Sequence, residues 1–143
     1  MNRSQKAAWL IVITTSIALI ASGTAITIFY SAFGFPKASA GLGFLGIAGI
    51  GGLARIVFKK DKGNVTVDER DNKINKRAAL AGFGAAYLFV GLACMTPFFV
   101  LGPDASIKVF WLPMIFMIAG VTNFYVHSIA ILVQYGKGGK ENE

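Results

Sequence analysis

The chain has 143 residues, of which 55% are hydrophobic and 15% are charged, and its mean hydropathy is +0.60. About a quarter of the residues in soluble domains are charged, so this composition excludes an ordinary soluble domain and indicates a membrane protein. The formal net charge of +7 follows the predicted loops, and we see no reason to assign it to nucleic-acid binding.

Four apolar runs are long enough to cross a membrane as helices. They cover residues 7–30, 39–58, 78–101 and 107–135. Each run meets the need for about 20 apolar residues to cross about 30 Å of hydrocarbon. The chain is therefore predicted to be all-α, with residues 1–143 forming a single polytopic domain, a bundle of four transmembrane helices.

Lysine and arginine are unevenly distributed among the predicted loops. Arg3 and Lys6 precede the first run, seven basic residues lie in the segment 59–77, and Lys137 and Lys140 follow the fourth run. The two remaining connections contain one lysine each. By the positive-inside rule, both termini and the segment 59–77 face the cytoplasm of a multi-pass inner-membrane protein.

The N-terminus allows a second interpretation. The residues "MNRSQK" and the following "AAWLIVITTSIALIASGTA" have the basic start, apolar core and small residues of a secretory signal. The apolar run continues through "ITIFY", beyond the usual core of about 7 to 15 residues. We favour an uncleaved first helix, whereas cleavage near residues 23–25 would leave three spans.

The second run contains "GLGFLG", which matches the dinucleotide-binding pattern Gly-x-Gly-x-x-Gly. That pattern requires a strand before it and a soluble helix after it, and neither is expected here. The glycines instead recur every third residue at Gly43, Gly46, Gly49 and Gly52. Small residues let helices approach closely in lipid, so we expect a packing face and not a nucleotide site.

Polar residues inside the spans are costly in lipid and are often functional. Arg55 lies one turn from the end of the second run, and Asn123 and His127 lie four residues apart in the fourth. Gly120 and Gln134 continue the same stripe, which should face the bundle interior. We interpret Asn123 and His127 as an interhelical hydrogen-bonding pair and Arg55 as an anchor that reaches the headgroups.

Groups for catalysis or metal binding are scarce in the sequence. Every Asp and Glu lies outside the predicted spans, so the carboxylate expected of a proton-coupled antiporter is missing. His127 is the only histidine and Cys94 the only cysteine, which leaves too few ligands for a metal or haem and no thiol pair. We therefore expect no catalytic residue, cofactor or metal.

The stretch "VTVDERDNKINKRAAL", residues 65–80, concentrates charge just before the third span. Thr66 and Glu69 are spaced as a capping box, and Glu69 and Lys73 are spaced as an i, i+4 ion pair. Apolar residues recur at helical spacing through the same stretch, at Val67, Ile74, Ala78 and Ala81. The pattern predicts a capped amphipathic helix that continues without a break into the third span.

The pattern Val65-x-x-Asp68-Glu69-Arg70-x-x-x-Ile74-x-x-Arg77-Ala78 resembles the Asp-Glu-Arg loop of a group of small, uncharacterised prokaryotic four-span membrane proteins. A lysine usually stands in that family where this chain has Arg77. The resemblance implies a bacterial or archaeal inner-membrane protein, and it implies no established activity. It also implies that the triplet matters beyond helix capping, since a capping box does not need Arg70.

The charged segment supplies the candidate interaction residues. They are Asp68, Glu69, Arg70, Asp71, Ile74 and Arg77. We predict a non-enzymatic accessory, regulatory or protective partner of another membrane component, which this segment would contact. The alternative is a self-associating transporter or channel for small solutes or ions, with the glycine-rich span at the interface and Asn123 and His127 lining the path.

Overall fold

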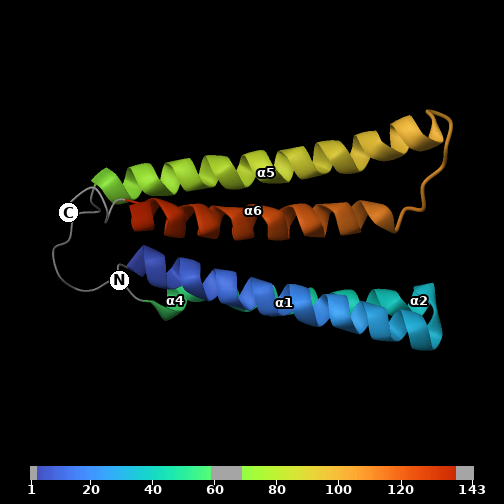
Figure 1. Cartoon of the computed structure of the whole chain (residues 1–143), viewed down its shortest axis with the longest axis horizontal. Coiled ribbons are helices and arrows are strands. Elements are labelled where there is room, and N and C mark those ends of the chain that lie inside the picture. Colours follow the sequence, from blue (N-terminus) through green and yellow to red (C-terminus); the bar gives the residue numbers. More distant parts are fainter. Residues whose placement is uncertain (1–2, 59–68, 138–143) are drawn as a thin grey trace. The chain divides into compact units, whose positions relative to one another are not determined.

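The computed structural model describes residues 3–58 and 69–137, and within them the side chains of all residues except 35, 36, 55, 56 and 137. Every regular element in these ranges is helical, which confirms the all-α prediction. The chain divides into two compact units, Met1–Asn64 and Val65–Glu143. Each unit consists of two antiparallel helical arms (Figure 1).

Among the described residues 3–58 and 69–137, three helices are long and apolar enough to cross a membrane. They are α1 (Arg3–Phe33), α5 (Glu69–Leu101) and the segment Trp111–Gly136 of α6 (Trp111–Lys137). These helices contain the first, third and fourth predicted spans, although α6 begins at Trp111 and not at residue 107. The reason is Pro113, whose ring would clash with the carbonyl of Val109 if the helix began earlier.

The second predicted span is a succession of short helices and not one α-helix. In chain order these are α2 (Phe35–Ala38), the 3-10 helix η1 (Ser39–Ile47), α3 (Ala48–Gly52) and α4 (Ala54–Val57). The arm turns back after α1 at Gly34, which has φ 77° and donates from its amide to the carbonyl of Tyr30 at 3.1 Å. A positive φ at this position is the usual glycine ending of a helix.

The two arms of the first unit pack through small residues. Those buried on α1 are Ala8, Thr15, Ala18 and Ser22. On the returning arm, a Cβ added to Gly41 would lie 2.7 Å from the amide nitrogen of Ile26, and one added to Gly51 would lie 3.1 Å from the Cα of Ile11. Gly41 and Gly51 therefore make the close approach that lipid-embedded helices use.

The glycines with period three do not make this contact. A Cβ added to any of them would meet no atom within 4 Å; they are Gly43, Gly46, Gly49 and Gly52. A 3-10 helix has three residues per turn, so Gly43 and Gly46 of η1 lie on one open face. Gly49 and Gly52 belong to the α-helix α3 and are open as well. The predicted packing role of these glycines is therefore wrong for the first unit, because no other described segment lies within contact distance of them.

In the second unit, α5 and α6 form an antiparallel hairpin joined by residues 102–110. Gly102, with φ 88°, ends α5 by donating to the carbonyl of Phe98 at 3.1 Å. The buried residues of this hairpin lie in the half away from the loop; they are Ile74, Ala78, Gly82, Ser128 and Ile131. The two ribbons diverge toward the loop (Figure 1).

Candidate functional site

The inner side of the first turns of α5 is held against α6. Ile74 and Ala78 are buried there, as the apolar stripe predicted. Ala81, the last residue of that stripe, is exposed, and Val67 lies outside the described residues. Near the end of α6, the hydroxyl of Tyr135 donates a 2.5 Å hydrogen bond to Oδ1 of Asp71. Hydrogen bonds to charged groups contribute about 1.5 to 3 kcal/mol, so this contact helps to hold the first turn of α5 against α6. The predicted residues Asp71 and Ile74 are thus packing residues of the hairpin.

The outer side of the same turns carries exposed charge. At 100° per residue, its four cations fall within an arc of about 120°; they are Arg70, Lys73, Lys76 and Arg77. Lys73 lies 2.7 Å from Glu69, which confirms the predicted i, i+4 ion pair. Four positive charges and the one negative charge of Glu69 leave a net charge of about +3. We call these five residues the cationic face of α5.

Two residues of interest from the sequence, and the side chain of a third, lie outside what the structure describes. Thr66 and Asp68 precede the described start of α5, so the capping box stays a prediction. Arg55 belongs to α4, but its side chain is outside the described set. Its role as a headgroup anchor also stays a prediction.

Farther along the hairpin, Asn123 and His127 of α6 lie against Gly82 of α5. A Cβ added to Gly82 would lie 2.6 Å from Oδ1 and 2.7 Å from the carbonyl oxygen of Asn123, and 3.1 Å from Cβ of His127. These distances are too short for any side chain, so the absence of one at Gly82 is what allows the two helices to approach. Both polar residues of the predicted pair therefore face a neighbouring helix.

The rest of the predicted stripe makes different contacts. A Cβ added to Gly120 would meet no atom within 4 Å, and the amide of Gln134 donates to the carbonyl of Ala130 on its own helix at 3.2 Å. Ser128 is fully buried and donates to the carbonyl of Phe124 at 2.9 Å. Gln134 and Ser128 thus bond to the backbone of their own helix, whereas Asn123 and His127 lie against α5.

The hydroxyl groups of α1 are also used by backbone carbonyls. Several donate to α1 itself, three or four residues back; they are Thr14, Thr24, Thr27 and Ser31. Ser22 instead reaches the returning arm and donates to the carbonyl of Gly41 at 3.0 Å. These bonds satisfy polar groups that would otherwise be costly in lipid.

In the second unit, the residues that the sequence patterns did not reveal are Tyr135 and Gly82. Tyr135 is the last residue of the fourth predicted span, and Gly82 lies within the third. Both residues lie in apolar runs that they barely interrupt. The partner of each lies on the other helix of the hairpin, far away in the sequence. The available signal was that an aromatic hydroxyl and a carboxylate sit at matching ends of two antiparallel helices.

Within residues 3–58 and 69–137, no three His, Cys, Asp or Glu side chains come together in an arrangement that could hold a metal ion. No protein-family model, curated protein or solved structure matches this chain. The candidate site therefore consists of the cationic face of α5 and the contacts that hold it against α6.

Proposed function

We propose that this chain is a non-enzymatic, four-span protein of a prokaryotic cytoplasmic membrane that acts as an accessory, regulatory or protective partner of another membrane component. Its cationic face would lie in the cytoplasm and make the contact. The observation that carries the proposal is the hydrogen bond from Tyr135 to Asp71. Because this bond and buried Ile74 hold one side of α5, the opposite side presents its charges together.

The length of the second arm supports a fourth span. η1 rises by about 2.0 Å per residue and the α-helices by about 1.5 Å, so residues 39–57 extend over about 33 Å. This length is comparable with about 30 Å of hydrocarbon. The arm also returns along α1, from the contact of Ser22 with Gly41 to the hydrogen bond that the guanidinium of Arg3 donates to the carbonyl of Phe58.

The chemistry of the cationic face suggests the kind of partner. A single exposed ion pair contributes at most about 1 kcal/mol, but four cations on one rigid helix can act together. Arg70 and Arg77 offer bidentate donors for carboxylates, which lysine does not. The partner we propose is therefore a membrane protein with an acidic cytoplasmic surface, which we prefer to a purely apolar partner.

The test is co-purification of the full chain with its partner from native membranes. Replacing Arg70 and Arg77 together with alanine should lower the partner yield about fivefold or more, because two charged contacts are lost. The matched control replaces Asn72 and Asn75, which are exposed on the same turns but carry no charge. Equal partner yields from the two double variants would refute the proposal.

A self-associating transporter or channel is the alternative function. The open glycine face that includes Gly46 and Gly49 would suit a second copy of the chain. Against it, the contact of Asn123 with Gly82 leaves no room for a solute between α5 and α6 at that depth. Solute flux in proteoliposomes of the purified protein, with no partner recovered from membranes, would favour the alternative.

A further inference from the structure

The open end of the α5–α6 hairpin encloses an apolar groove of about 790 Å³. Its walls include Phe89, Ala93 and Pro97 of α5 and Trp111, Ile115 and Ile118 of α6. This volume is within the range of about 300 to 1,000 Å³ that ligand pockets usually have. The groove lies wholly within the second unit and is distinct from the cationic face at the other end of α5.

The groove exists because the hairpin is closed at only one end. Near Gly82 the helices are in backbone contact, whereas no residue from 83 to 127 is buried. Pro97 lines the groove and has no amide hydrogen, so the carbonyl of Ala93 lacks its usual helical donor. Prolines commonly bend transmembrane helices at such positions.

The depth of the groove matches one leaflet of a bilayer. On α5 the lining runs from Phe89 to Leu101, about 18 Å along the axis, and on α6 from Trp111 to Ile118, about 10 Å. Half of a hydrocarbon core of about 30 Å is about 15 Å. A groove of this depth can hold the acyl chain of a lipid that lies parallel to the helices.

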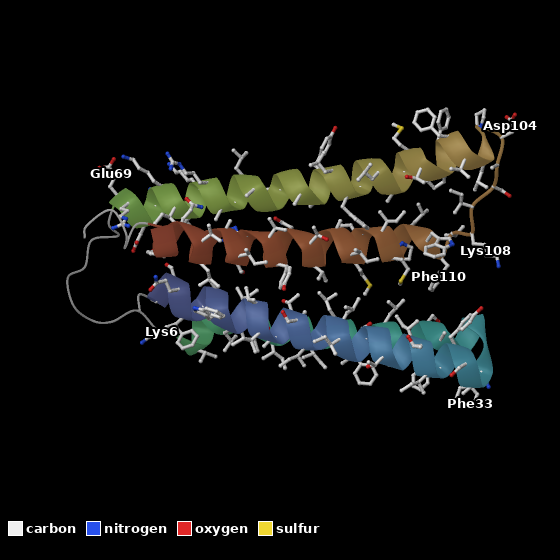
Figure 2. All side chains as sticks on the ribbon, viewed as in Figure 1. Lys6, Phe33, Glu69, Asp104, Lys108 and Phe110 are labelled. Carbon is white, nitrogen blue, oxygen red and sulfur yellow. The ribbon has the colours of Figure 1, made fainter. Side chains whose placement is uncertain are left out.

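The loop end of the groove carries a positive charge. Lys108 belongs to the lining, whereas Asp104, the acidic residue of the same loop, does not. The two residues lie at different ends of the loop, Lys108 close to the start of α6 (Figure 2). Trp111, one of the lining residues, is of a type enriched at the membrane interface. The charged end of the groove therefore corresponds to headgroup depth.

We propose that this groove binds one membrane phospholipid, with an acyl chain between α5 and α6 and the phosphate at the Lys108 ammonium. Lys108 is exposed at the loop end of the groove. A phosphate there supplies a counter-charge to its ammonium, which an apolar protein helix would not. The site goes beyond the proposed function, because it depends on neither the cationic face nor a protein partner. It depends only on placement of the hairpin in a membrane.

Quenching of Trp111 fluorescence tests this site in the full chain. The chain has two tryptophans, so Trp9→Phe leaves Trp111 as the only reporter. In detergent, this variant is titrated with phosphatidylglycerol that carries bromine atoms on its acyl chain, because bromine quenches only nearby tryptophan. We expect quenching to saturate at one lipid per chain.

Two pairs of variants in this background separate a site from bulk lipid. Lys108→Gln should raise the half-saturating lipid concentration about threefold or more, and Lys108→Arg should keep it within about twofold of the parent. Ala93→Phe should fill the groove and remove the saturable quenching. Leu88→Phe, at an exposed position of α5 outside the lining, should leave it unchanged.

Two results would overturn the lipid site. Quenching that rises without saturation, equally in Lys108→Gln and Lys108→Arg, would show that lipid merely surrounds the protein. No quenching in any variant would show that protein covers the groove, whether the first unit of this chain or a second copy. Because the Lys108 pair conserves size and polarity, it remains decisive even if Ala93→Phe fails to fold.

Discussion

Tyr135 and Asp71 are 64 positions apart in the sequence, and the hydroxyl of Tyr135 donates a 2.5 Å hydrogen bond to the carboxylate of Asp71. The bond joins the last turn of α6 to the first turn of α5. Together with buried Ile74 it fixes which side of α5 faces inward. The direction of the cationic face follows from this bond, from buried Ile74 and from the contact of Gly82 with Asn123.

Removing the hydroxyl should loosen the start of α5. We expect Tyr135→Phe to lower the stability of these turns by about 1 to 2 kcal/mol, because the Asp71 carboxylate loses a donor. Hydrogen exchange of the amides from Lys73 to Arg77, the first that can bond to carbonyls within α5, should become faster. Tyr87→Phe is the control, since Tyr87 is 81% exposed, and unchanged exchange in Tyr135→Phe would contradict the proposed role of this bond.

The contact at Gly82 should tolerate no side chain. Gly82→Ala would place a methyl group 2.6 Å from Oδ1 of Asn123, and we expect a loss of about 1 to 3 kcal/mol from overpacking. Gly84→Ala is the matched control, because a Cβ at Gly84 meets no atom within 4 Å and alanine favours helix. Thermal unfolding in detergent measures both. A higher or equal midpoint for Gly82→Ala would show that the helices do not meet there.

A similar comparison tests the first unit. Gly51→Leu should destabilise the packing of α3 on α1, because the added side chain would meet Thr14 Oγ1 at 2.7 Å and the backbone of Ile11. Gly46→Leu should leave that packing unchanged. Thermal aggregation in detergent would separate the two variants. The reverse order of stability would show that the period-three glycines form the contact after all.

The long apolar helices and the Glu69–Lys73 ion pair could be predicted from the sequence because they depend on local composition and spacing. The 3-10 geometry of η1 could not, since its period of three was interpreted on an α-helical wheel. Gly41 and Gly51 were missed because the sequence does not show which glycines of the returning arm face α1.

The register of the α5–α6 hairpin is the second feature that local patterns did not reveal. Asp71 lies opposite Tyr135 and Gly82 lies opposite Asn123, so both pairs belong to one antiparallel alignment. That alignment depends on the residue at which the loop ends and α6 begins. Pro113 makes α6 begin at Trp111, and the hydropathy of the sequence does not show this starting point. A sequence pattern therefore indicated that Asn123 and His127 face inward but not what they contact.

Accessibility of introduced cysteines tests the membrane topology. In a Cys94→Ala background, an impermeant thiol reagent should reach a cysteine at Asn72 only from the cytoplasm, and cysteines at Lys37 or Asp104 only from outside. Labelling of Asn72 and Lys37 from the same side would show that residues 39–57 do not cross the membrane. Labelling of a cysteine at Asn72 from outside would place the cationic face outside the cell and exclude the proposed cytoplasmic partner.

The central claim is that a partner contacts one side of the first turns of α5. A photo-crosslinking amino acid can be placed at Lys73, within the cationic face, or at Asn75, about 160° around the helix at nearly the same depth. Irradiation of intact cells should give one discrete protein adduct from position 73 and none from position 75. Adducts of equal yield from both positions, or an adduct from position 75 alone, would contradict the claim.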